Sequence, residues 1–124
     1  MDPPIFVFEG GLRHVFASAE AVAARLEWPD VALGLYDAFD SRGRRVTLRV
    51  VETPRRLRGF DVVDRVVAVE GAEQEPSGQA ELRARLVDYL GSLDLDPAYL
   101  AGAALADLVR LVEERAAPRR RAWP

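Results

Sequence analysis

The sequence predicts an α+β fold in which an antiparallel sheet of about five strands carries helices packed on one face. Short runs rich in β-branched and aromatic residues fill much of the chain from residue 5 to residue 70, and glycine-containing turns separate several of them. Residues 77–112 instead show the spacing of amphipathic helices. The expected order is β-β-α-β-β-β-α-α. Residues 1–117 are expected to form one domain, and residues 118–124 a basic C-terminal tail.

The chain is expected to begin with a tight β-hairpin. Residues 5–9 and 12–16 are rich in β-formers and flank Gly10-Gly11, a dipeptide that tolerates the positive φ angles of a two-residue turn. Ser18 is then a suitable helix N-cap, because its hydroxyl can accept a hydrogen bond from a free backbone N–H. The alanine-rich residues 19–26 are therefore predicted to form the first helix.

A second hairpin is expected at the centre of the chain, with residues 33–40 and 44–52 flanking the turn Ser41-Arg42-Gly43. A three-residue loop places Asp40 opposite Arg44. This register gives a core face made of Gly34, Tyr36, Ala38, Val46, Leu48 and Val50. The other face is mixed and is expected to be exposed, with Leu33, Leu35 and Phe39 beside Arg45 and Arg49. A slip of one residue would instead place Leu33, Leu35 and Phe39 with the valines, since side chains alternate with period two.

The remaining elements follow from local patterns. Residues 53–59 resemble a loop, and the valine-rich residues 61–70 are interpreted as a strand, although helical spacing is also present there. Ser77 is expected to cap a helix that ends near Gly91. Asp96-Pro97 is expected to start another helix, which Gly102 divides.

Charge is distributed unevenly along the chain. The net charge is −3, all 17 basic residues are arginine and no cysteine is present, which excludes disulfides and thiolate chemistry. Residues 41–60 hold seven arginines and one acidic residue, Glu52, whereas residues 1–40 hold two arginines and seven acidic residues. The basic block is local, so nucleic acid is not the expected partner. No secretory signal or membrane-length apolar run is present, and the expected location is the cytoplasm.

The sequence offers little support for an enzyme. His14 is the single histidine, and no serine lies in a nucleophile elbow. Gly10-Gly11 precedes a strand instead of a helix, so it is not a phosphate loop. Three acidic pairs are better explained as caps or solvated loop residues than as metal ligands: Asp61 with Asp64, Glu73 with Glu75, and Asp94 with Asp96. No catalytic, cofactor-binding or metal-binding residue is therefore assigned.

Two groups of residues are candidates for binding a partner. Arg55, Arg56 and Arg58 lie close together and could steer and hold an acidic partner, although solvated arginines are the simpler interpretation. Leu35, Phe39 and Arg49 belong to the mixed face of the central hairpin. Exposed apolar surface with a charged rim often marks an interface.

Several short runs carry a resemblance: Gly10-Gly11-Leu12, Phe16-x-Ser18-x-Glu20-Ala21, Gly34-x-Tyr36-x-Ala38-Phe39-Asp40 and Glu81-Leu82-Arg83. Together they resemble a group of small uncharacterised actinobacterial proteins, similar in style to the immunity proteins that bacteria encode beside secreted toxins. The resemblance implies a non-enzymatic cytoplasmic protein that binds a protein partner, such as a toxin whose active site it occludes. A monomer or a weak homodimer is expected. The alternative is a small ligand-binding or regulatory module, with a pocket lined by aromatic residues such as Trp28, Tyr36, Tyr89 and Tyr99.

Overall fold

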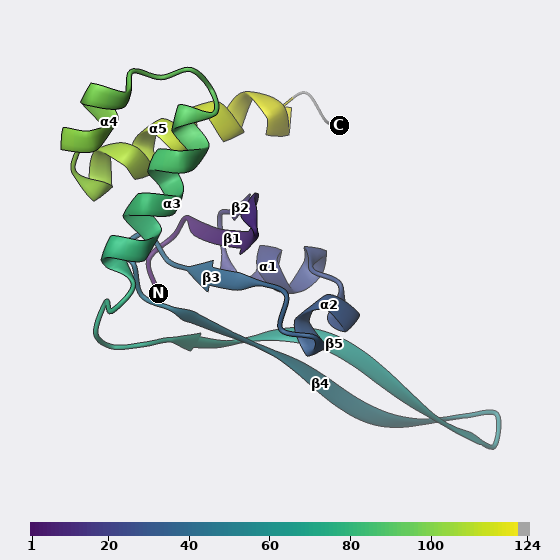
Figure 1. Ribbon diagram of the computed structural model, residues 1–124. Helices are drawn as coiled ribbons and strands as arrows, with labels where there is room; N and C mark the ends of the chain where they lie inside the picture. Colours follow the sequence, from purple (N-terminus) through teal and green to yellow (C-terminus); the bar gives the residue numbers. More distant parts are fainter. Residues whose placement is uncertain (122–124) are drawn as a thin grey trace.

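The structure, a computed structural model, describes residues 1–121 and the side chains of residues 1–116. Within this range the chain forms a mixed α+β fold (Figure 1). Its strands are β1 (Ile5–Glu9), β2 (Gly11–Phe16), β3 (Asp37–Phe39), β4 (Val46–Leu57) and β5 (Phe60–Ala72). Its helices are α1 (Ala19–Arg25), α2 (Trp28–Ala32), α3 (Gln79–Gly91), α4 (Pro97–Gly102) and α5 (Leu105–Arg121). The α+β class predicted from the sequence is confirmed.

The strands form two antiparallel sheets instead of the single sheet that was expected. One sheet has the order β2-β1-β3, and the other is the two-stranded ribbon β4-β5. The hairpin predicted around Gly10-Gly11 is confirmed as β1 and β2, and Gly10 has a φ of 77°. The central strand β1 is buried on both sides, because alternate residues point to opposite faces of a sheet.

Two hydrophobic clusters therefore lie on opposite faces of β1. Phe6 and Phe8 pack with Phe39 and with buried residues of α3, α4 and α5. Ile5 and Val7 pack with residues of α1 and with the base of the β4-β5 ribbon. The prediction that all helices pack on one face of the sheet is therefore wrong. Helices α3, α4 and α5 cover one face of the three-stranded sheet, while α1 and the ribbon cover the other (Figure 1).

The predicted central hairpin is wrong beyond its turn. The turn itself is present, since the Asp40 N–H donates to the Arg44 carbonyl at 2.9 Å and Gly43 has a φ of 82°. One bridge, between Phe39 and Arg45, is all that joins β3 to the start of β4. Strand β3 pairs with β1 instead, and β4 pairs with β5.

Burial explains why β3 pairs with β1 and why β4 pairs with β5. Beside β1, the two neighbours Ala38 and Phe39 are buried in the two different clusters, so β3 is covered on both faces. The alternating valines of β4 are matched by those of β5, and this supplies a longer ladder than residues 33–40 could offer. Residues before β3 are not a strand, because α2 ends at its C-cap Leu33 and Gly34 has a φ of 69°.

The helix starts follow the expected capping chemistry. The Ser18 hydroxyl accepts from the Ala21 N–H, and the Asp96 carboxylate accepts from the Ala98 N–H, each at 3.1 Å. Gly102 ends α4, as predicted. Ser77, in contrast, is not the N-cap of α3; that position belongs to Gly78, and Ser77 binds Glu73 instead.

The last helix, α5, extends into the predicted C-terminal tail. Helix α5 runs to Arg121 and so includes the first part of the tail predicted at residues 118–124; residues 122–124 lie outside the described residues. Within residues 1–121, none of the helices combines the length and the apolar character that a membrane crossing requires.

Candidate functional site

The most exposed feature of the fold is the β4-β5 ribbon. Its strands pair from Val46 and Ala72 at the base to Leu57 and Phe60 at the tip. The base packs against the body, and the rest extends away from it as a narrow projection (Figure 1). Residues 53–64, the outer part of this ribbon, are called the arm below. The valine-rich residues 61–70 are thus confirmed as a strand.

The two strands of the arm stay paired up to its tip, because a two-residue turn joins them. Arg58 and Gly59 both have positive φ angles, 52° and 81°, as a type I′ turn requires. Such a turn continues the right-handed twist of its flanking strands and favours a long ribbon. Residues 53–59 were predicted to be a loop, and this prediction is wrong because Arg58-Gly59 supplies the whole turn.

The ribbon has two different faces, because cross-strand partners lie on the same face and successive pairs alternate. Leu48 with Val69 and Val50 with Val67 lie on the face turned toward the body, and Leu48, Val67 and Val69 pack in the cluster that contains Val22. The opposite surface is called the outer face. From base to tip its cross-strand rows are Arg49 with Ala68, Val51 with Val66, Thr53 with Asp64, Arg55 with Val62, and Leu57 with Phe60.

Large apolar side chains on the outer face are open to solvent. Phe60 keeps 73% of its surface exposed, Val66 keeps 53% and Leu57 keeps 50%. Val63, on the face turned toward the body, is also exposed. Four such side chains close together on one projection form the kind of exposed apolar patch that marks an interaction surface.

The arginines predicted as a binding group do lie together, on the arm. Arg55 forms an ion pair with Asp64, with 3.3 Å between its Nε atom and a carboxylate oxygen. Among the side chains of residues 1–116, the structure gives neither Arg56 nor Arg58 a carboxylate within ion-pair distance. The tip, residues 54–60, contains three arginines and no acidic residue. The tip is therefore locally positive in a chain that is negative overall, and the next acidic residue, Asp61, lies opposite Arg56 on β5.

The second predicted group does not form one surface. Phe39 is completely buried, with its ring 5.9 Å from that of Phe8, so its assignment as a partner-binding residue is wrong. The physical reason is that β3 pairs with β1 within a sheet covered on both faces. Leu35 is exposed but precedes β3. Arg49 lies on β4 and pairs with Glu70 at 3.7 Å.

Sequence reasoning missed Phe60 and Val66 as exposed residues of the ribbon. A signal for them was present. Arg58-Gly59 lies between two runs of β-formers, and counting outward from this turn places Leu57, Phe60 and Val66 on one face. The signal was overlooked because the cluster of arginines and Pro54 resembles a loop.

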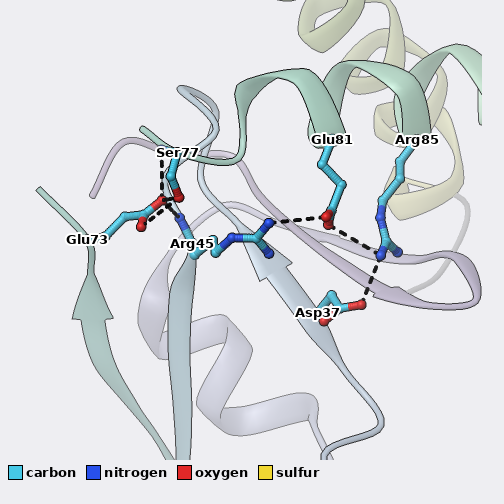
Figure 2. A network of polar contacts seen from close by, with 6 residues as sticks. All are labelled: Asp37, Arg45, Glu73, Ser77, Glu81 and Arg85. Atoms are coloured by element: carbon cyan, nitrogen blue, oxygen red, sulfur yellow. Dashed lines mark hydrogen bonds and ion pairs between the residues drawn. The ribbon is translucent and has the colours of Figure 1, made fainter. Parts of the chain in front are cut away.

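A network of polar side chains fixes the base of the ribbon to α3 (Figure 2). The Arg45 guanidinium contacts Glu81 at 3.1 Å, and Arg85 contacts both Glu81 and Asp37. Glu73 accepts hydrogen bonds from the Arg45 N–H at 2.9 Å and from the Ser77 hydroxyl. These contacts orient the ribbon, because Arg45, just before β4, pairs with α3, and Glu73, just after β5, is held by Arg45 and Ser77.

The network is suited to structure more than to proton transfer. Hydrogen bonds from the Arg45 N–H and from Ser77 lower the pKa of Glu73. The hydrogen bond from the Arg45 guanidinium lowers the pKa of Glu81 in the same way, and it raises the pKa of Arg45. Both carboxylates are therefore held in their charged form at neutral pH, where a general acid would need a raised pKa.

The other ionisable candidates are also explained by local structure. Burial, together with the nearby Arg13 and Arg25, lowers the pKa of His14, whose ring stacks on Phe16 at 5.1 Å between centroids. Asp61 and Asp64 point to opposite faces of β5, because they are three residues apart on a strand. Within the described part of the chain, no three His, Asp or Glu side chains gather closely enough to hold a metal ion.

The aromatic residues considered for a ligand pocket do not converge. Tyr36 packs with the cluster beside α1 and donates a hydrogen bond to Asp30 at 3.2 Å, whereas Tyr89 packs with the cluster beside α3. Tyr99 is exposed on α4, and Trp28 lies under the Arg65 guanidinium at 5.0 Å. They belong to different parts of the fold.

Comparisons with known proteins give no relative from which a function could be transferred: no family model, no curated protein and no solved structure matches this chain.

Proposed function

We propose that this chain is a cytoplasmic, non-enzymatic protein-binding domain whose β4-β5 arm holds an acidic protein partner. The observation that carries the proposal is the composition of the tip. Residues 54–60 present three arginines, no acidic residue and the exposed side chains of Leu57 and Phe60 on one narrow projection. Apolar anchors next to arginine are the combination that dominates the binding energy of many protein interfaces.

Charge supports an acidic partner over nucleic acid. Three of the 17 arginines gather at the tip, while the whole chain carries −3. A compact positive site steers a complementary protein surface over short range, whereas nucleic-acid domains are usually basic as a whole. Arg56 and Arg58 are the residues that we assign to this contact, because neither is paired with a carboxylate among the described side chains.

The shape of the arm supports inhibition as the outcome of binding. A two-stranded ribbon that ends in a two-residue turn is narrow enough to enter a cleft, and exposed residues occupy both strands near its tip. A partner whose active cleft is lined with carboxylates would be blocked by such an insertion. We therefore propose the role of an immunity protein, which binds a bacterial toxin and occludes its active site.

The proposal is tested with the variant Arg56→Ala/Arg58→Ala. Tagged wild-type and variant proteins are used to capture partners from nuclease-treated lysate of the source organism, and the partner is identified, purified and titrated in a calorimeter. We expect a 1:1 complex whose Kd rises about tenfold or more in the variant, because two charged contacts near the centre of the interface are lost. Affinity should also fall as salt is raised.

The matched control is Arg13→Ala/Arg110→Ala, which removes two arginines from the body. Both are exposed, and each pairs with an acidic residue three or four positions earlier in the chain, Glu9 for Arg13 and Asp107 for Arg110. Their loss should therefore leave Kd unchanged. Equal weakening by both double variants would contradict the assignment to the tip. Capture that disappears with nuclease treatment would favour nucleic acid as the partner instead.

A further inference from the structure

We infer that the arm opens and closes as a unit of its own, while the body and the base of the ribbon stay folded. The boundary of this unit is the row of Glu52 with Arg65, the last cross-strand row before the arm. The inference concerns the conformation of the arm in the free chain, so it does not depend on the proposed function.

The first argument is that the arm adds nothing to the hydrophobic core. All residues from 52 to 61 are exposed, and none of residues 53–64 is buried. Neither of the two hydrophobic clusters in the described part of the chain includes a residue of the arm. A two-stranded ribbon without such packing is at best marginally stable in water. The paired arm is therefore only slightly favoured over an open one.

The second argument is that the body holds the base of the ribbon. Leu48, Val67 and Val69 pack in the cluster that also contains residues of α1. Just before β4, the Arg45 guanidinium contacts Glu81 on α3 at 3.1 Å. Opening the base would expose these apolar side chains to water and would break this contact. The base therefore opens only together with a larger part of the fold.

The third argument is a clamp at the boundary between base and arm. The Arg65 Nε atom donates to a Glu52 carboxylate oxygen at 3.0 Å, and the Arg65 guanidinium lies 5.0 Å from the ring centroid of Trp28 on α2. A guanidinium over an indole ring is an attractive contact. Arg65 thus joins both strands of the ribbon to α2, whereas the ion pair of Arg55 with Asp64 joins only the two strands of the arm. Opening that begins at the tip therefore stops at Arg65.

The inference also bears on the proposed contact, and this step rests on the proposed function. Only the paired arm holds Arg56, Arg58 and Phe60 together on one narrow projection. A partner that binds the paired form shifts the population toward it. The amides of the arm should therefore gain protection from exchange in a complex. A complex that leaves them unchanged would contradict the binding role of the arm, and it would not affect the inference for the free chain.

Opening is tested in the free chain by native-state hydrogen exchange, followed residue by residue with NMR. We expect protection factors below about 10² for the paired amides of the arm. The amides of β1 should have protection factors above about 10³, because they exchange only when the whole domain unfolds. Equal protection in the arm and in β1 would overturn the inference.

Variants of the turn show whether the arm opens separately from the body. Gly59 has a φ of 81° and open space around the position of a Cβ atom, so Gly59→Ala adds only backbone strain at the tip. We expect it to lower the protection of the arm about tenfold, and Arg58→Asn, which gives the preferred Asn-Gly turn, to raise it. Neither variant should change exchange in β1 or the midpoint of urea denaturation. A midpoint that shifts in step with exchange of the arm would overturn the inference.

The boundary is tested with Arg65→Ala, and the matched control is Arg49→Ala. Arg49 also pairs with an acidic residue of the ribbon, Glu70, but it lies on the outer face, whereas Arg65 contacts α2. We expect Arg65→Ala to let opening extend into the base, so that protection at Val51 and Val66 falls about tenfold. Arg49→Ala should leave this protection within about twofold of wild type. Equal effects of the two substitutions would overturn the assigned boundary.

Discussion

Phe39→Ala is expected to lower the free energy of unfolding by about 3–5 kcal/mol, the usual cost of removing a large aromatic side chain from a core. Phe39 is completely buried, it packs edge-on against Phe8, and the guanidinium of Arg45 lies 5.2 Å from its ring centroid. The substitution would leave a cavity between β3 and α3. Urea denaturation followed by circular dichroism measures the effect.

The control is Phe60→Ala, measured in the same way. Phe60 keeps 73% of its surface exposed, so its truncation should change the free energy of unfolding by less than about 0.5 kcal/mol. The two phenylalanines thus have opposite roles, one in the core and one on the arm. A small effect at Phe39 together with a large effect at Phe60 would contradict the assigned strand partners.

Gly43→Ala is expected to have an effect of similar size, for two separate reasons. Gly43 has a φ of 82°, and a residue with a Cβ atom pays about 1–2 kcal/mol for left-handed backbone. The new Cβ atom would also lie 2.6 Å from the Cα atom of Gln79, at the start of α3. Overpacking against backbone adds about 1–3 kcal/mol. Together the two costs come to about 2–5 kcal/mol, again measured by urea denaturation.

Gly10→Ala separates the two contributions. Gly10 has a similar φ of 77°, but nothing lies within 4 Å of the position that its Cβ atom would occupy. Only the backbone cost of about 1–2 kcal/mol should remain. If the two alanine variants were equally stable, the close approach of the Gly43 turn to α3 would not exist.

This close approach matters for the placement of the ribbon. The Gly78 N–H donates to the Gly43 carbonyl at 2.9 Å, and a Cβ atom on Gly78 would lie 2.6 Å from the Phe39 ring. Two glycines therefore let the turn before β4, the core residue Phe39 and the start of α3 meet without intervening side chains. Arg45 and Ser77, two residues after Gly43 and one before Gly78, belong to the network of Figure 2.

Local chemistry allowed part of this fold to be predicted. The Gly10-Gly11 hairpin, the Ser18 and Asp96 caps and the break at Gly102 all depend on interactions between residues close in sequence. Such interactions are visible as short patterns. The predicted strand at residues 61–70 depended in the same way on its run of valines.

The partners of β3 and β4 could not be found by the same reasoning. A turn at Ser41-Arg42-Gly43 is compatible with a hairpin, but it is equally compatible with a chain that leaves one sheet and enters another. The choice depends on whether β1 and β5 offer more burial than the hairpin would, which is a property of distant segments. The register then decides which side chains are exposed, so the error in strand pairing became the error at Phe39.

For the candidate site, the cluster of Arg55, Arg56 and Arg58 was visible from composition, because these residues are neighbours in the sequence. The structural setting of this cluster was not visible from composition. Arg55 and Arg56 lie on a paired strand and Arg58 lies in the two-residue turn, and all three share the arm with Leu57 and Phe60. The turn at Arg58-Gly59 is the local feature that connects these residues.

The most direct test of the arm as a separate binding element is to shorten it. Residues 54–63 are replaced by Asn-Gly, so that Thr53 and Asp64 take the position next to the turn that Leu57 and Phe60 now occupy. The account predicts a folded protein whose free energy of unfolding is within about 1 kcal/mol of wild type, because the deleted residues bury little surface. It also predicts that partner capture is lost. A shortened chain that unfolds, or that binds as well as wild type, would contradict the account.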